Sequence, residues 1–290
     1  MHRPFQRFVG VDLGGARGKT TAVAHLAARP DGTVWVEDVS TRAAGPHGDA
    51  WRDETLGEHL VSLAGQSAVI AIDAPLTAPA CGRCVRPACP GAEVCEDPAV
   101  VWLRTEGRAL VLDTEAEAEV AGRGHVTRLT STTSSTSRPR ARLVPYAHRA
   151  TEVRACFERD LLPVTALGNA VGPIAARAHH LVRRLAGAGL ALNERVLEVS
   201  AAATVSALFD RRVARGYKRD ADPWETRAVV LESLPDLSFA PQSRLAREDT
   251  LRNDHCFEAI IAGYTAFLWA RDGWQMPGGW NAADGWIWTP

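Results

Sequence analysis

Two aspartates end short apolar runs in the first quarter of the sequence. Asp12 ends the run at 8–12 (FVGVD), and Asp73 lies near the end of the run at 68–76 (AVIAIDAPL). Runs of this kind are typical of buried strands, and open α/β sheets bind their ligands beyond the carboxyl ends of such strands. Neighbouring carboxylates repel each other unless a cation lies between them. The sequence therefore predicts a site for Mg²⁺ or Mn²⁺, which prefer oxygen ligands.

Further acids come from the second half of the chain. Asp254 and Glu258 are four residues apart and share one face of a helix, although Asp254 has the alternative role of a helix N-cap. Glu258 lies in an apolar stretch, where a lone acid is costly, and Glu198 lies on a predicted buried strand. Acids arranged around metal ions favour phosphodiester hydrolysis. The predicted catalytic residues are Asp12, Asp73, Asp254, Glu258 and Glu198, with Asp12, Asp73 and Glu258 as metal ligands.

Three other charged residues are predicted to bind substrate. Arg149 and Glu152 are spaced i, i+3 on a helical pattern and form either a surface ion pair or a substrate clamp. Lys218 is one of only two lysines and is a candidate contact for a phosphate. His255 follows Asp254 and is either a proton donor or a structural residue.

Four cysteines lie close together near the end of the first third of the chain. Cys81, Cys84, Cys89 and Cys95 follow the pattern C-x2-C-x4-C-x5-C within a loop at 77–98 that is rich in proline and glycine. This density favours metal ligands over disulfides in a chain expected to be cytoplasmic. Zn²⁺ would make a closed structural site with four thiolates, and a [4Fe–4S] cluster is the alternative.

The glycine-rich stretch after Asp12 invites comparison with a phosphate loop, because residues 18–20 read GKT. A phosphate loop needs a glycine five residues before the second one, and that position is Leu13. The residues that follow are β-branched and apolar, so we predict a hairpin of two strands, 8–12 and 20–26, instead of a loop that opens a helix.

Length and composition describe one ordinary α/β domain. The chain has 290 residues, 46% of them apolar and 23% charged, and a net charge of −1. No membrane span is expected, the N-terminus lacks a signal-peptide pattern, and a nucleic-acid or nucleotide partner would have to be held by a local patch or a metal site. The predicted strands are 8–12, 20–26, 33–40, 68–76, 195–200 and 284–288, and the predicted helices are 51–64, 99–120, 169–187, 201–209, 223–234 and 247–271.

Three antiparallel strands followed by parallel ones predict a mixed sheet with helices on both faces, as in ribonuclease H topology. A Ser/Thr-rich segment at 129–142 is predicted to be a flexible loop, and the arginine-rich region around it is either a solvated loop or a phosphate-contacting flap. In this topology the first and fourth strands are neighbours, so Asp12 and Asp73 are expected to converge.

The order of these motifs resembles the family called domain of unknown function 429, which is described as predicted nucleases of ribonuclease H fold. The matching segments are GVDLGG, AIDAPL, RATEVR, LEVSAAAT, the YK of 217–218, NDHCFEAIIAGYTAFLWA and DGWIWTP. The resemblance implies an acidic site at Asp12, Asp73, Asp254 and Glu258. The chain departs from the family pattern at Ser200 and Ala201, where a Tyr/His–Pro pair is commoner.

Two other functions remain open at this stage. GVDLGG also resembles the phosphate-binding hairpin of actin-like ATPases and sugar kinases, which usually carry the fold twice, whereas one acid-bearing hairpin is found here. The other alternative is a metal-stabilised module that binds nucleic acid or a partner without catalysis. The residues do not specify DNA or RNA, nor an oligomeric state.

Overall fold

The computed structural model describes residues 3–15, 20–43, 48–110, 143–159 and 171–290. They divide into two compact units, which we describe separately. The first comprises Met1–Leu76, Pro173–Gln275 and Ile287–Pro290, and the second comprises Thr77–Gly172 and Met276–Trp286. The predicted Ser/Thr-rich loop at 129–142 and the end of the predicted helix at 99–120 lie outside the described residues. The expectation of one domain across the whole chain stays a prediction.

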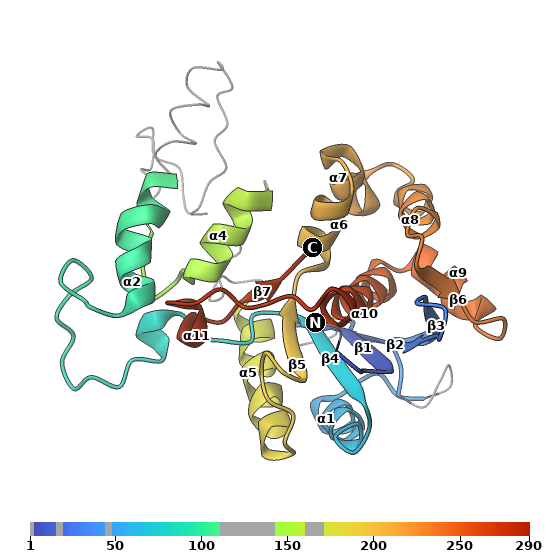
Figure 1. Ribbon diagram of the computed structural model, residues 1–290, viewed down its shortest axis with the longest axis horizontal. Helices are drawn as coiled ribbons and strands as arrows, with labels where there is room; N and C mark the ends of the chain where they lie inside the picture. The colour runs from blue at the N-terminus through green and yellow to red at the C-terminus, as the bar shows by residue number, and fades with distance from the viewer. Residues whose placement is uncertain (1–2, 16–19, 44–47, 111–142, 160–170) are drawn as a thin grey trace. The chain divides into compact units, whose positions relative to one another are not determined.

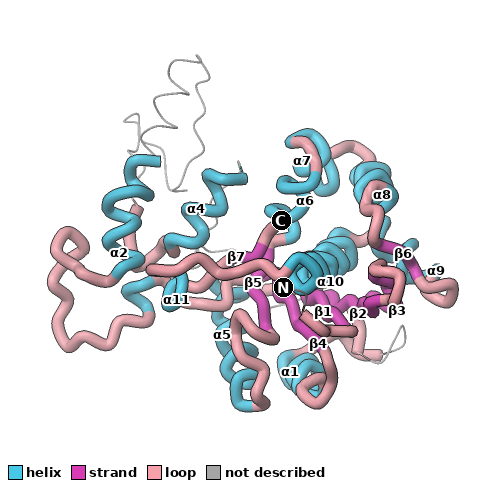
Figure 2. Tube along the Cα trace, viewed as in Figure 1, coloured by secondary structure: helices cyan, strands magenta, loops and turns pink. Residues whose placement is uncertain are grey.

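The first unit is built on a seven-stranded mixed sheet, drawn in magenta in Figure 2, with the strand order β6-β3-β2-β1-β4-β5-β7. Strands β1, β2 and β3 pair antiparallel, and β4, β5 and β7 continue the sheet parallel to β1. The antiparallel-then-parallel order confirms the predicted mixed sheet. The strands are β1 Arg7–Asp12, β2 Ala22–Ala28, β3 Val34–Ser40, β4 Ala68–Asp73, β5 Val196–Val199, β6 Leu237–Phe239 and β7 Ile287–Trp288.

The segment after the glycine-rich turn is a strand, as the hairpin interpretation predicts. β1 and β2 pair antiparallel, with Asp12 opposite Ala22, and no helix begins in the described residues directly after the turn. Residues 16–19, which include the glycine and lysine of GKT, are outside the described residues. A phosphate loop would continue as a helix at this point, so the hairpin is the better description of the fold here.

Helices cover both faces of this sheet (Figure 1). On one face, Val9, Val11, Ile70 and Ile72 pack in a core with residues of α1 and α5. On the other face lies α10, which packs so closely that a Cβ atom on Gly10 would meet its backbone. The helices of this unit are α1 Asp53–Ser62, α5 Gly172–Gly187, α6 Ala201–Leu208, α7 Arg211–Arg219, α8 Pro223–Glu232, α9 Arg244–Arg252 and α10 Asp254–Asp272.

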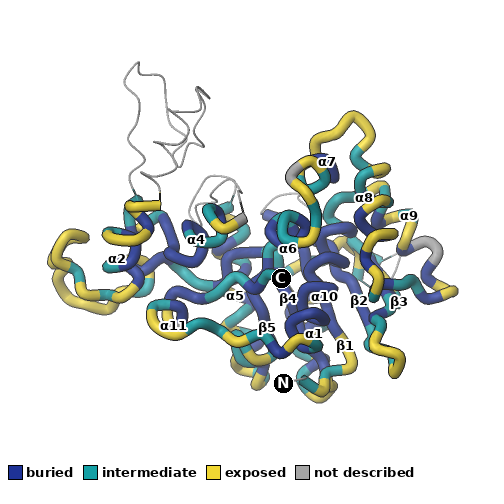
Figure 3. Tube along the Cα trace, turned by 45° about the horizontal axis from the view of Figure 1, so that its top comes forward, coloured by how far each residue is buried: buried dark blue, intermediate teal, exposed yellow. Residues whose placement is uncertain are grey.

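The predicted long helix at 247–271 is wrong in one respect, because it is two helices. Asn253 takes an extended backbone conformation (φ −117°, ψ 116°) and separates α9 from α10. Its side chain accepts a hydrogen bond from the backbone N–H of His255 (3.0 Å) and so caps α10. α10 is buried from Cys256 to Ala270, which Figure 3 shows in dark blue. The break therefore starts a new, central helix just before the predicted acids.

The second unit is smaller and mostly helical. Its core joins Trp102, Leu103, Ala150 and Val153 with further small residues. Its helices are the 3₁₀ turn η1 Ala80–Gly82, α2 Pro98–Trp102, the π-helical η2 Leu103–Gly107, α4 Ala150–Arg159 and α11 Asn281–Asp284. Within the described residues of either unit, no helix combines the length and apolar character needed to cross a bilayer.

Candidate functional site

Asp12 and Asp73 lie side by side at the end of two parallel strands. β1 and β4 pair in parallel, and the two aspartates are partners in the register as the last residue of each strand. Side chains alternate along a strand, so Asp12 shares the face of Gly10, against which α10 packs. The two aspartates predicted to converge are thus neighbours in the sheet.

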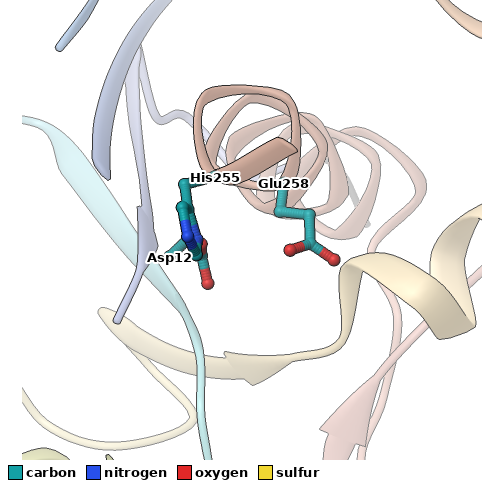
Figure 4. Close-up of side chains that lie close together, drawn as sticks. All are labelled: Asp12, His255 and Glu258. Atoms are coloured by element: carbon teal, nitrogen blue, oxygen red, sulfur yellow. The ribbon is translucent and has the colours of Figure 1, made fainter. Parts of the chain in front are cut away.

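α10 adds two side chains to this end of the sheet. His255 and Glu258 are three residues apart in the first turns of the helix, and each offers a ligand atom close to Asp12. The ligand atoms of Asp12, His255 and Glu258 all lie within 4.8 Å of one another (Figure 4). Across the described ranges, this is the only group of three or more His, Cys, Asp or Glu side chains that is so close.

Glu258 is held by two residues of α7. The hydroxyl of Tyr217 donates to Oε1 of Glu258 (2.8 Å), and Nζ of Lys218 lies 2.7 Å from the same oxygen. Tyr217 is buried, whereas 44% of the Lys218 side chain is exposed. α7 therefore fixes the orientation of the Glu258 carboxylate and brings one cation to it.

The two aspartates are held in a similar way. Oδ2 of Asp12 lies 2.5 Å from Nδ1 of His255. Oδ2 of Asp73 accepts a hydrogen bond from the backbone N–H of Ala201 (3.0 Å), at the start of α6, which Ser200 caps. An N–H group in the first turn of a helix has no partner within the helix, so a carboxylate satisfies it well.

Each of these three carboxylates commits one oxygen to protein donors and leaves the other available. We call Asp12, Asp73 and Glu258 the carboxylate cluster; Asp12 and Glu258 belong to the 4.8 Å group with His255, and Asp73 is the neighbour of Asp12 in the sheet. Within the described part of the chain, Oδ1 of Asp12, Oδ1 of Asp73 and Oε2 of Glu258 make no hydrogen bond or ion pair. Three acids with one uncommitted oxygen each match the ligand preference of a hard divalent cation.

The electrostatics of the cluster also favour a cation. Burial, followed by the negative charges of Glu258 and Asp12, raises the pKa of Asp73 well above its usual range. Burial and the charge of Asp12 raise the pKa of Glu258, and Lys218 offsets part of this effect. The hydrogen bond to Asp12 raises the pKa of His255. The fold thus holds more negative charge here than Lys218 alone compensates.

Two predicted acids are not brought into the cluster. Glu198 pairs with Ile72 in the β4–β5 register, one residue before Asp73, so it points to the opposite face of the sheet. There it is buried, and its Oε2 accepts a hydrogen bond from the backbone N–H of Leu76 (2.9 Å). Asp254 is the first residue of α10. The side chain that lies close to Asp12 and Glu258 is that of the next residue, His255.

The predicted substrate-binding residues are occupied within the protein. Lys218 is bonded to Glu258, as described above. Arg149 and Glu152 belong to the second unit, where Nη2 of Arg149 lies 2.9 Å from Oε1 of Glu152 in a buried ion pair. Nη1 of Arg149 also donates to Oγ1 of Thr77 (2.8 Å). The ion pair that was predicted for the surface is therefore buried. A role of these residues in substrate binding stays a prediction.

The four predicted cysteine ligands are free thiols. Cys81, Cys84 and Cys89 are exposed, and Cys95 is half-buried. Their four sulfur atoms do not form a group within 4.8 Å of one another in the described structure. A metal at this loop stays a prediction, to which we return below.

Sequence reasoning gave too little weight to His255 and assigned no role to Tyr217. His255 lies three residues before the predicted ligand Glu258, and this i, i+3 spacing places both side chains on one helix face. Tyr217 precedes Lys218, but its hydrogen bond to Glu258 joins positions 41 apart in the chain. No local pattern predicts such a contact.

Comparison of the chain with protein-family models, with curated proteins and with solved structures found no match. The geometry of the carboxylate cluster and the sequence pattern are therefore the basis for a functional proposal.

Proposed function

We propose that the protein is a hydrolase of phosphodiester bonds, a nuclease or a related phosphoesterase, that depends on a divalent metal ion. The observation that carries this proposal is the close group of Asp12, His255 and Glu258 at the carboxyl end of β1, with Asp73 beside Asp12 at the end of β4 and one uncommitted oxygen on each acid. Mg²⁺ or Mn²⁺ is the ion that suits three carboxylate oxygens. When bound, such an ion polarises a phosphoryl oxygen and lowers the pKa of coordinated water.

The order of the central strands supports a ribonuclease H-like fold. Five neighbouring strands of the sheet have the order β3-β2-β1-β4-β5. The first three pair antiparallel, and β4 and β5 continue parallel to β1. This is the arrangement that the resemblance to the domain of unknown function 429 implies, and membership of that family is part of the proposal. β6 and β7 extend this arrangement at its two edges.

The residues around the cluster have distinct roles in this proposal. Asp12, Asp73 and Glu258 hold the ion, and Tyr217 orients Glu258 through the 2.8 Å hydrogen bond to Oε1. His255 orients Asp12 through its Nδ1 and is partly exposed, with 36% of its side chain accessible.

Lys218 supplies positive charge on the solvent side of the site. Its Nζ is 2.7 Å from Glu258, and nearly half of its side chain is exposed, so a phosphate at the site would meet this ammonium group. A nucleic acid or a nucleotide is the substrate class that matches a metal with an adjacent ammonium group.

The test is cleavage of end-labelled single- and double-stranded DNA and of single-stranded RNA, each with Mg²⁺, Mn²⁺ or EDTA. We expect metal-dependent cleavage by the wild type and its loss in Asp12→Asn and Glu258→Gln. Glu225→Gln removes an exposed acid of α8 and is the matched control, which retains cleavage. Cleavage that persists in Asp12→Asn would overturn the assignment.

The same samples separate the two alternatives. ATP with Mg²⁺ is included as a substrate, and release of phosphate from ATP without strand scission would favour the actin-like ATPase or kinase function. Tight binding of nucleic acid that survives both substitutions, without turnover of any substrate, would favour a non-enzymatic binding module.

A further inference from the structure

The Cys loop, residues 81–95 of the second unit, has little secondary structure. Gly82 and Arg83 donate to the carbonyl of Pro79, and Val94 donates to that of Gly91. Between Arg83 and Gly91, the described structure has no backbone–backbone hydrogen bond that begins and ends within the loop. Holding a residue in one conformation costs about 1–2 kcal/mol of entropy, so a fixed conformation of this segment would need another stabilising interaction.

Hydrophobic burial does not supply that interaction. Val85 is 96% exposed and Val94 is 64% exposed, although both lie between the cysteines. Among the four cysteines, Cys95 alone packs against the core of the second unit. Chain segments that cannot bury an apolar core are commonly held by disulfides or metals, and these cysteines are free.

Two arginines fix both ends of the loop. Arg83 lies between the first two cysteines, and its guanidinium contacts Asp284 (3.1 Å) and Asp97 (3.4 Å). Arg104 of η2 donates to the carbonyls of Ala92 (2.7 Å) and Cys95 (3.2 Å). The segments that carry the first two thiols and the last thiol are therefore both anchored within the second unit.

The four thiols lie within fifteen residues of one loop, and all four are free. A divalent ion binds cysteine as the thiolate and displaces the proton. The sulfurs need to draw together to bind one ion, and metal sites in small loops usually complete their geometry as the ion binds.

We propose that Cys81, Cys84, Cys89 and Cys95 bind one Zn²⁺ as four thiolates, in a structural site that orders the Cys loop. A closed four-thiolate site leaves no open position for catalysis. Zinc fits better than a [4Fe–4S] cluster, because three of the four cysteines are exposed and the valines point outward, so the loop has no apolar shell around a redox centre. The proposal does not depend on the function proposed for the carboxylate cluster.

The test measures metal content and thiol accessibility in the full chain, purified without chelators. We expect one zinc ion per chain by elemental analysis, and tetrahedral thiolate absorption bands after replacement by Co²⁺. Cys84→Ser and Cys89→Ser should reduce zinc to near zero. Cys156→Ala, which removes a thiol of α4 outside the loop, is the matched control and should keep one ion.

A second measurement keeps the proposal testable if a cysteine variant fails to fold. Cleavage at the exposed Glu93 of the wild-type loop by a glutamate-specific protease should be slow with zinc and become faster after a chelator removes it, relative to cleavage elsewhere in the chain. Zinc at background level with a cleavage rate unaffected by chelator would overturn the proposal. A brown protein that contains iron and sulfide would overturn the choice of zinc.

Discussion

The contact between Gly10 of β1 and α10 gives the sharpest test of the structure. A Cβ atom at Gly10 would lie 1.8 Å from the carbonyl oxygen of Ala259 and 2.4 Å from the backbone nitrogen of Gly263. An ordinary contact of this kind begins at 3.4 Å, so Gly10→Ala requires the strand and the helix to separate by roughly 1.6 Å.

The cost of this substitution follows from which atoms must move. Overpacking a core usually costs about 1–3 kcal/mol when side chains can adjust, and here both contacts are with backbone. We therefore expect Gly10→Ala to lower the free energy of unfolding by about 3 kcal/mol or more. Because α10 carries His255 and Glu258, the same displacement should also disperse the 4.8 Å group at Asp12 and weaken metal binding.

The assay is urea-induced unfolding followed by circular dichroism, with two comparison variants. Gly65→Ala is the control, because a Cβ atom there meets nothing within 4 Å, and its effect should stay within about 0.5 kcal/mol. Gly263→Ala is intermediate. Its Cβ atom would meet a methyl group of the buried Leu26 side chain at 2.6 Å and the backbone nitrogen of Gly10 at 3.3 Å, while alanine favours the helix. If Gly10→Ala is as stable as Gly65→Ala, the close packing of α10 on β1 is refuted.

Three further outcomes follow from the structure. Asp73→Asn removes one repelling charge, so the melting temperature of this variant without metal should be higher than that of the wild type. Excess Mn²⁺ at 100 times the Kd should stabilise the wild type by about 2.7 kcal/mol and should not stabilise the variant. An equal shift of the melting temperature by Mn²⁺ in both proteins would contradict this. Burial, and then the neighbouring His59, lowers the pKa of His25 from 6.5 to about 4. Between pH 4 and 6.5 this histidine is therefore protonated in the unfolded chain and neutral in the folded one. Stability should therefore be present above pH 6.5 and fall by up to about 3 kcal/mol as the pH drops toward 4, and urea unfolding at several pH values should show a smaller fall in His25→Gln. Tyr217→Phe removes a donor from the buried Glu258 and should cost about 1–3 kcal/mol in the same unfolding assay, with no change expected if the 2.8 Å hydrogen bond is absent.

The sequence predicted the parts of the fold that depend on local patterns. The apolar runs before Asp12 and Asp73 identified β1 and β4, and the β-branched residues after the glycine-rich turn identified β2. These elements are strongly apolar and have clear ends, so the neighbouring positions of the two aspartates followed from topology. β6 has only three residues, and α7 is rich in arginine with few apolar positions, so neither pattern stood out from a loop.

The composition of the site was harder to predict, because it depends on how elements are turned toward one another. Glu198 was placed on the correct strand, but the pairing of β4 with β5 points it away from Asp73. The choice between Asp254 and His255 depends on where α10 begins, and that depends on the extended conformation of Asn253. Spacing along a helix gives the relative positions of side chains, whereas the rotation of the helix against the sheet is set by packing.

The register that pairs Asp12 with Asp73 also determines which side chains of β4 lie in the hydrophobic core. If β4 slid by one residue, Asp73 would turn away from its partner, and Ile70 and Ile72 would leave the core that they share with α1 and α5. A one-residue insertion within β4 would thus disturb the core together with the acid pair. The surroundings of the acids can vary independently of the sheet through segments that approach from outside it, such as the α7 helix that carries Tyr217 and Lys218.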